Sequence, residues 1–454
     1  MTDADGEAAG DAGESRDPRD SRERAVDGVT RRDALKAAVA VGGAAGLSAC
    51  LDRLDDPDPV PGGDGPDAHP DRQYAWNDFV RTDDAGNWQL PRHQTLLYLS
   101  LPEDGPPSDS EREAVREALD ALDEAYEWSH EGLLHTVGYS PAYFDRFEAE
   151  LSVPEDVSLP EPTPLADYET PEFDTQDVLV HLASDRPDAV LAAEEALTGE
   201  ASEANGVDFP SALTDALTED DRRTGFFDPG MPHEEADDLA GVPEPNPVPE
   251  DAPLFMGFAA GFRGNQATED AVAIGEGPFA EGTTESMGNW RQRLADWYGE
   301  QSFEQQVTEM FSPGHAEENL VEGVGTNLGD DSGIDRFLDT VVEDAEEYGR
   351  VGHAQKAARA NRDEEGTPLL LRRHFESADD DIASLHFPSL QRSIDQFEAV
   401  RRAMNGVDAT DATPAVRQRV NNGILEYIFL RHRGYFLVPP RGLRALPTPD
   451  GSEG

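Results

Sequence analysis

The chain has 454 residues, and 95 acidic side chains oppose 36 basic ones, which gives a formal net charge of -59. So acidic a chain disfavours nucleic-acid binding through a basic face, and its single cysteine excludes an internal disulfide. Hydrophobic residues make up 37% and aromatic residues 7% of the sequence, enough for a core in two or three domains.

The basic residues are almost all arginine, and the acidic ones are spread along the chain. This composition is typical of a protein kept soluble in very high salt, where charge repulsion is screened over a few ångström. Disorder or a cation-binding polymer is the alternative interpretation of such acidity. Apolar periodicity over most of the chain favours folding instead.

The N-terminal region reads as an export segment. Residues 1–29 show no apolar period and are expected to be disordered. Residues 30–50 resemble a twin-arginine lipoprotein signal, with Arg31 and Arg32, a short apolar run, and a lipobox that ends at Cys50. We therefore expect export by the twin-arginine pathway and a lipid anchor on Cys50 that holds the protein at the cell surface. The alternative is a chance arginine pair before an alanine-rich helix with a buried thiol.

Residues 51–72 are rich in Pro, Gly and Asp and are expected to form a tether. Apolar spacing then predicts alternating strands and helices in the first half of the folded part. The expected elements are a strand over 92–101, a helix over 108–129, a strand over 132–139, a short helix over 140–148, a strand over 177–185, a helix over 186–197 and a strand over 254–262. Residues 218–250 read as an acidic, proline-rich insert or long loop.

The second half repeats this plan. The expected elements are an aromatic-rich helical region over 287–311, a strand leading into an amphipathic helix over 385–406, and a helix or strand with an extended tail over 424–440. The order predicts an α+β fold of tandem ferredoxin-like domains, with antiparallel sheets and helices packed on one face. The expected boundaries are 73–275 and 276–440, followed by a tail over 441–454.

Rare basic residues gather in one region. The segment VGHAQKAARANR (351–362) holds Lys356, one of two lysines, and LLLRRHF places Arg372 and Arg373 side by side. A guanidinium stays cationic at any working pH and can stabilise developing negative charge. For this motif alone, a surface pair at a strand end is the plainer interpretation. His374 and His386, twelve residues apart, would by chance rarely form a metal site.

These segments, together with SLHFPSLQRSIDQFEAVRRAMNG, resemble the dye-decolourising (DyP-type) haem peroxidases. GYSPAYFDRF, DVLVHLASDRPDAVLAAEEAL, GTTESMGNWRQRLADWYGEQSFEQQVTEMF and RGYFLVPP are similar to further family segments, in the right order over roughly residues 73–440. The resemblance implies two dimeric-ferredoxin-like domains, of the α+β barrel-like type, and one haem b in the second. It also implies a peroxidase that oxidises organic substrates with hydrogen peroxide.

By this resemblance, His353 matches the proximal iron ligand and Arg372 the distal catalytic arginine, with Arg373 as its neighbour at the cofactor. Asp344 or Glu346 could accept a hydrogen bond from the other nitrogen of His353. The region around Ala260 and Asn265 would form the distal wall. The implied partners are hydrogen peroxide, an organic reductant and the membrane through the lipid anchor, and homo-oligomerisation is left open.

The sequence departs from the family at the distal position. Family members have GFKDGTxNP, whereas this chain has GFAAGFRGNQ, so Ala260 stands in place of the aspartate. Losing a general acid/base typically costs ~10²–10⁴-fold in rate. Water with Arg372, or Glu269 or Asp270, could replace it. Gln355 stands where the family often has arginine. Two alternatives therefore stay open: a non-catalytic haem-binding lipoprotein in haem or iron handling, and a haem-less scaffold.

Overall fold

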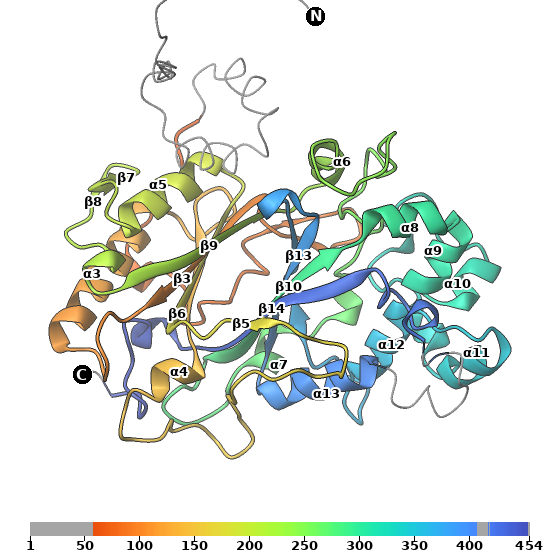
Figure 1. Cartoon of the computed structure of the whole chain (residues 1–454). Helices are drawn as coiled ribbons and strands as arrows, with labels where there is room; N and C mark the ends of the chain where they lie inside the picture. Colours follow the sequence, from red (N-terminus) through yellow and green to blue (C-terminus); the bar gives the residue numbers. More distant parts are fainter. Residues whose placement is uncertain (1–57, 406–415, 417, 453–454) are drawn as a thin grey trace, which may run out of the picture.

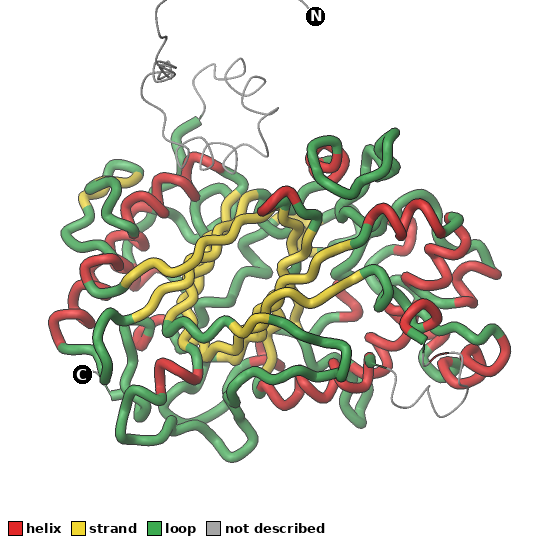
Figure 2. The backbone as a smooth tube through the Cα atoms, viewed as in Figure 1, coloured by secondary structure: helices red, strands yellow, loops and turns green. Residues whose placement is uncertain are grey.

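The computed structural model describes residues 58–405, 416 and 418–452. The expected signal, with Cys50, lies outside these residues. Figures 1 and 2 show strands at the centre of the molecule, with α3 and α5 on one side and α8 to α12 on the other. No helix of the described part is both long and apolar enough to cross a membrane.

The first sheet follows the ferredoxin-like order. Its strands lie in the order β9-β3-β6-β4, with one helix after β3 and another after β6, which is the βαββαβ plan. The elements are β3 (His93–Ser100), α3 (Asp109–Ala125), β4 (Leu134–Tyr139), α4 (Pro141–Phe144), β6 (Val178–Ser184), α5 (Pro187–Leu197) and β9 (Thr218–Phe226). Helix α3 begins where it does because Ser108 and Glu111 form a capping box.

The second sheet repeats the plan in the order β12-β13-β10-β14, and the short β11 also pairs with β13. Its elements are β10 (Thr283–Gln292), α8 (Leu294–Glu300), α9 (Phe303–Met310), α10 (Pro313–Glu317), α11 (Val341–Glu347), α12 (His353–Ala360), β11 (Leu371–Arg372), β12 (Phe375–Ser377), β13 (Ser384–Gln391), α13 (Ile394–Met404) and β14 (Ile428–Val438). The expected α+β fold of tandem ferredoxin-like units is confirmed.

The two sheets join at both edges into a closed ring. Strand β12 pairs with β9 through Glu376 and Phe226, and β14 pairs with β4 through Leu437 and Tyr139. Smaller elements lie around the ring: β1 (Arg81–Thr82), β2 (Trp88–Gln89), β5 (Glu172–Phe173), β7 (Glu203–Ala204), β8 (Val207–Asp208), α6 (Met231–Ala236) and α7 (Glu269–Val272).

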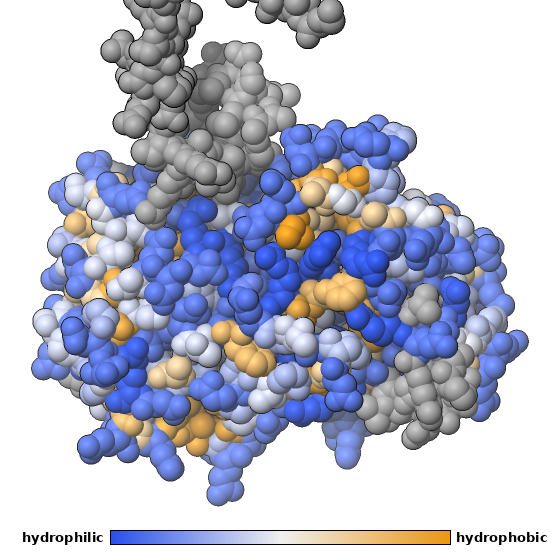
Figure 3. Space-filling view, in the orientation of Figure 1, coloured by the Kyte–Doolittle hydropathy of each residue, from blue (hydrophilic) through white to orange (hydrophobic). Residues whose placement is uncertain are grey.

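Alternating residues of one strand serve two cores, as the two-residue period of a strand requires. On β3, Leu97 and Leu99 belong to the core beneath α3 and α5. Leu96 and Tyr98 point the other way and belong to an apolar cluster between the sheets, completed from the second repeat by Met287, Phe375 and Phe436. Burying each of these side chains stabilises the fold by about 1.5–3 kcal/mol. The outer face in Figure 3 is mostly hydrophilic, in keeping with the net charge.

Several expected segments differ from the structure. The expected tether over 51–72 is packed on the first repeat from residue 58 on, where Gly63 N donates to the Glu124 carbonyl at 3.2 Å and Glu127 N donates to the Pro61 carbonyl at 3.0 Å. The expected strand over 254–262 is a series of turns, because Gly257 and Gly261 adopt φ of 85° and 77°, outside the extended region. The expected helical region over 287–311 begins with the end of β10, and the first helix starts only at Leu294.

The expected acidic insert over 218–250 is also wrong at its start, where β9 is part of the first sheet. Its charged residues looked like a loop because no sequence pattern reveals their partners. In the structure, Arg222 pairs with Glu194 and Arg223 with Asp174. Tertiary contacts therefore override the weak strand preference of this segment.

Substitution of Gly225 tests the junction of β9 and β12. A β-carbon on Gly225 would lie 2.3 Å from Cδ2 of Phe375 and 2.4 Å from the carbonyl oxygen of Glu376. We expect Gly225→Ala to destabilise the protein by about 1–3 kcal/mol in chemical denaturation, because overpacking displaces the neighbouring strand. Gly299→Ala in α8 is the control, since no other atom lies within 4 Å of its β-carbon. Equal stability of the two variants would contradict this junction.

Candidate functional site

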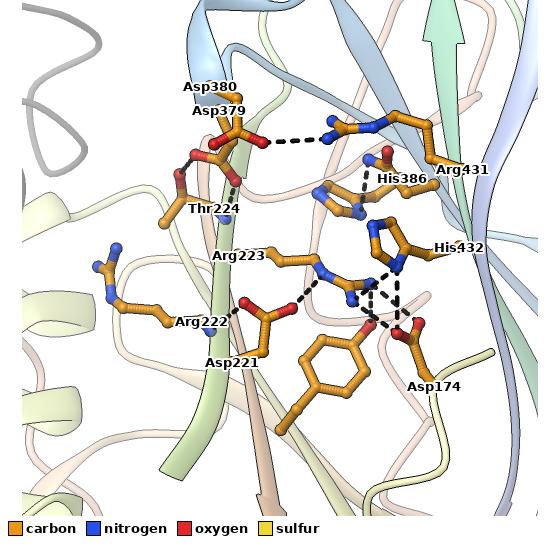
Figure 4. Close-up of polar contacts among 12 residues, drawn as sticks. Asp174, Asp221, Arg222, Arg223, Thr224, Asp379, Asp380, His386, Arg431 and His432 are labelled. Atoms are coloured by element: carbon orange, nitrogen blue, oxygen red, sulfur yellow. Dashed lines mark hydrogen bonds and ion pairs between the residues drawn. The ribbon is translucent and has the colours of Figure 1, made fainter. Parts of the chain in front are cut away.

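The protein contains two groups of charged side chains, and in the first group each arginine has a carboxylate partner (Figure 4). Arg223 donates to the two carboxylate oxygens of Asp174 at 2.9 and 2.6 Å and to Asp221 at 2.8 Å. Arg431 pairs with Asp380 at 3.1 Å. The labelled group also contains Arg222, Thr224, Asp379, His386 and His432. Because each guanidinium in this group has a carboxylate partner, we assign the group a role in stabilising the fold.

The adjacent arginines of the second group have different partners. Arg373 donates to Glu269 at 2.7 Å and lies over the Trp76 ring, 4.8 Å from its centroid. Arg372 donates only to neutral oxygens, at 3.3 Å to Gln266 Oε1 and 3.4 Å to the Asn265 carbonyl. Within the described part of the chain no carboxylate forms an ion pair with it. Burial lowers the pKa of Arg372 to about 10, so the side chain is a cation without a counter-ion.

Close backbone contacts fix the position of His353, the first residue of α12. A β-carbon on Gly352 would lie 1.8 Å from the Phe311 carbonyl oxygen, and one on Gly423 would lie 2.9 Å from the His353 Cα atom. Only glycine allows the chain to pass this closely. Residues on both sides therefore hold the start of α12 in one place.

The His353 imidazole is neutral and incompletely bonded. Burial, together with the nearby charges of Lys356, Arg401 and Arg372, lowers its pKa to about 3. Arg372 is thus near enough for its charge to act on His353. The Nδ1 atom is buried and has no hydrogen-bond partner. A neutral imidazole with a nitrogen to spare is the form that binds a metal.

The expected acceptor for His353 is absent. Asp344 accepts hydrogen bonds from Gln355 at 2.6 Å and Thr340 at 2.9 Å, and Glu346 is exposed. Gln355 also donates to the Phe337 carbonyl at 2.7 Å. The carboxylate assigned from the sequence to the ligand therefore ties α12 to α11 instead.

Lys356 is a second basic side chain without a carboxylate partner in the described residues, and it is buried. Its Nζ donates to the Met404 and Asn422 carbonyl oxygens at 3.0 and 3.1 Å, and to the Asn422 side chain. Burial lowers the pKa of Lys356 well below its usual value. Since other buried arginines such as Arg401 and Arg433 share the carboxylate of Glu169, the deficit of negative charge is local to this site.

A cavity of about 20 Å³ lies beside Arg372 and is lined by Ala260, Gly261, Gln266 and His374, among others. It has room for one molecule the size of water. Both ring nitrogens of His374 are buried without a partner, and so is the amide nitrogen of Asn265. Buried polar groups are normally hydrogen-bonded. Their gathering here indicates a place for a polar ligand.

The residues fit a haem on two counts. In the described residues, no group of three or more Cys, His, Asp or Glu could hold a metal ion, so an iron at His353 would need most of its ligands from a cofactor. Lys356 and Arg372 have only neutral hydrogen-bond partners among the described residues, so an anionic cofactor would favour their charged forms. The structure places Arg372 beside Ala260 at the cavity and in contact with the Asn265 carbonyl, near enough for its charge to act on His353. Arg373 also lines the cavity, but it donates to Glu269.

Sequence reasoning missed His374 as a site residue. Its signal was the spacing, because residues 372 and 374 of an extended segment point to the same side. The ring stacks on Phe387, with centroids 6.2 Å apart, whereas His386 lies against Phe375. The two histidines therefore do not form a metal pair. Glu269 is held by Arg373, and Asp270 pairs with Arg72, so neither carboxylate lines the cavity beside Ala260.

Comparison with known proteins identifies a family and a fold. The sequence model of a family described as a family of unknown function, DUF7405, matches residues 91–440. None of the curated proteins matches the chain. Solved DyP-type proteins are similar in fold at low identity, which shows that the chain has the DyP fold.

The dye-decolorizing peroxidase from Bacteroides thetaiotaomicron VPI-5482 is 14% identical, with a TM-score of 0.51 over 82% of this chain and 99% of that one. DyPB from Rhodococcus jostii RHA1 is 15% identical, with a TM-score of 0.51 over 78% of this chain and 95% of that one. A variant of DypB from the same organism, in complex with heme, is 15% identical with a TM-score of 0.50 and the same coverage.

The adjacent arginines should respond to substitution in opposite directions. Without haem, Arg372→Met should raise the free energy of unfolding by about 1 kcal/mol, because it removes a half-buried charge that has no carboxylate partner. Arg373→Met should lower it by about 2 kcal/mol, since it leaves Glu269 unpaired; the 19% exposure of the Glu269 side chain moderates the loss. Urea denaturation of the haem-free variants measures both. Changes of the same sign would contradict the charge assignment.

Proposed function

The chain belongs to DUF7405, a family of unknown function, and we propose that it is a haem-dependent peroxidase of the DyP type that oxidises organic substrates with hydrogen peroxide. The observation that carries this proposal is the uncompensated Arg372 beside unpaired buried polar atoms, within electrostatic range of the neutral His353. The DyP fold supports it by placing both residues in the second repeat.

Each residue has a defined role in this proposal. His353 would hold the iron of haem b, and the cations of Lys356 and Arg372 would balance the cofactor's negative charge. Haem, when bound, supplies iron and the electrons that peroxide reduction requires. Arg372 remains cationic at neutral pH with a pKa of about 10, so it can stabilise negative charge on the departing oxygen. Gln266 positions it by accepting from its backbone nitrogen at 2.8 Å and its Nε at 3.3 Å.

A second candidate function is haem binding without catalysis, as in a lipoprotein that handles haem or iron. The observation that favours it is Ala260, which cannot transfer a proton. Both candidates require His353, and they differ in whether Arg372 contributes to turnover.

The location of this chemistry is part of the proposal. Export by the twin-arginine pathway and lipidation at Cys50 would place the folded protein on the outer side of the membrane. In the native host, Cys50→Ser should move the protein from the membrane fraction to the soluble exported fraction, because the anchor is lost. Immunoblotting of the fractions measures this, and an unchanged distribution would contradict lipidation.

Haem binding is the first test. Protein made in a haem-sufficient host should show a Soret absorption band, and His353→Ala should reduce haem content at least tenfold because the iron loses its protein ligand. His233→Ala in α6 is the control for histidine loss away from the site. A colourless wild type, or full pigment in His353→Ala, would refute the proposal.

Turnover separates the two candidates. Peroxide-dependent oxidation of a dye should fall ~10²–10³-fold in haem-loaded Arg372→Ala, because one preorganised charge is removed. Arg402→Ala, whose side chain is 54% exposed on α13, is the control. If the pigmented wild type oxidises no dye and Arg372→Ala changes nothing, the protein binds haem without catalysis.

A further inference from the structure

We infer that His374 is the acid/base that moves the peroxide proton in place of the missing carboxylate at position 260. This inference rests on the proposed function, and it assigns a proton carrier that the sequence left open. It is argued from the surroundings of His374, from its place beside Arg372 and from the absence of a competing group on the cavity.

The ring nitrogens of His374 are free to accept or donate a proton. Both ring nitrogens are buried and unpartnered, so neither is committed to holding the structure together. Burial, together with the charge of Arg372, lowers the pKa of His374 to about 3. The ring is therefore neutral at pH 7 and offers a lone pair. By comparison, both ring nitrogens of His315 are bonded, to Ser312 at 2.8 Å and to the Ser332 carbonyl at 2.9 Å.

The ring is placed where the peroxide would be handled. His374 lines the same small cavity as Arg372 and Ala260. Its Cε1 atom lies 3.5 Å from where a β-carbon on Gly261 would be, so the ring packs beside the loop that carries Ala260. Stacking on Phe387, at an interplanar angle of 16°, fixes the plane of the ring. The small side chains at 260 and 261 leave space in front of it.

No other residue on the cavity can exchange a proton near neutral pH. Its remaining lining is apolar, amide or arginine. The half-buried Glu269 is bonded to the lining residue Arg373 and to the backbone of Trp76 and Asn77. Glu376 accepts from Phe255 N at 2.8 Å and from Gln292. His374 is therefore the one candidate among the described lining residues.

The proton is conserved in the proposed step. His374 takes a proton from one oxygen of hydrogen peroxide and returns it to the other as the O–O bond breaks, and this oxygen leaves as water. Arg372 stabilises the charge that develops on the leaving oxygen. Over a full cycle one hydrogen peroxide, two protons and two electrons give two waters, and the organic reductant supplies the electrons. The imidazole ends the step neutral, as it began.

The test compares His374→Gln with His386→Gln in haem-loaded protein. His386 is a matched control because it is also buried with an unpartnered Nε2, but it does not line the cavity. The rate of reaction with hydrogen peroxide, followed by the Soret band, should fall ~10²–10⁴-fold in His374→Gln and less than threefold in the control. Cyanide association should slow as well, since hydrogen cyanide must give up its proton to bind; this readout does not depend on turnover.

Two variants at position 260 complete the test. In the His374→Gln background, Ala260→Asp should raise the rate of reaction with hydrogen peroxide at least tenfold. In the wild-type background, Ala260→Asp should raise the rate of reaction with hydrogen peroxide less than tenfold if His374 already carries the proton. This measurement does not require the His374→Gln variant to fold. A ~10²-fold gain in Ala260→Asp alone, or unchanged peroxide and cyanide rates in His374→Gln, would overturn the inference while leaving the peroxidase proposal intact. A colourless wild type would overturn both.

Discussion

The apolar layer between the two sheets is the interaction on which the rest of the molecule depends. The edges of the sheets meet through few backbone pairs, Glu376 with Phe226 and Leu437 with Tyr139. Such short ladders contribute little, so packing of Leu96, Tyr98, Met287, Phe375 and Phe436 must keep the sheets face to face. With the layer fixed, β11 and the loop with Ala260 and Gly261 are fixed on one side of the second sheet. Arg372 and His374 derive their positions from it.

Charge is distributed by the same rule almost everywhere in the interior. Arg223, Arg373, Arg401 and Arg433 each face a carboxylate, which offsets the cost of burying a guanidinium. Arg372 and Lys356 break the rule within one region, in a protein with a net charge of -59 and therefore no shortage of carboxylates. A local excess of buried positive charge in such a chain reduces stability, and the cost is understandable if an anionic partner is to be bound there.

Periodicity was sufficient to predict the plan of the fold. The first βα unit and the strands around β6 carry plain two-residue and 3.6-residue patterns, and their order led directly to the ferredoxin-like units. Strand β9 was missed because its charges look solvated until Glu194 and Asp174 are placed beside them. The strand expected over 254–262 failed because an apolar composition says nothing of the positive φ at Gly257 and Gly261.

The site was predictable to the extent that it follows from family resemblance. His353 and Arg372 matched segments of known type, whereas the choice between Arg372 and Arg373 needed the position of Glu269, 104 residues away in sequence. Asp344 was assigned to the wrong partner because helix spacing could not show that its carboxylate accepts a hydrogen bond from Gln355. Nothing in the sequence marks an unpaired nitrogen, so His374 became visible only when its surroundings were known.

The closed ring has a consequence for the order in which the protein can be built. Strand β14 ends at Val438 and pairs with β10 and also with β4 of the first repeat. While the chain emerges from the ribosome, β9 therefore remains an open sheet edge until β12 has been made, and β4 remains one until β14 has been made. Open edges invite pairing with other chains. The stage at which only the first repeat has been made is thus the one most prone to aggregation, and pairing of β12 and β14 with the first repeat ends it.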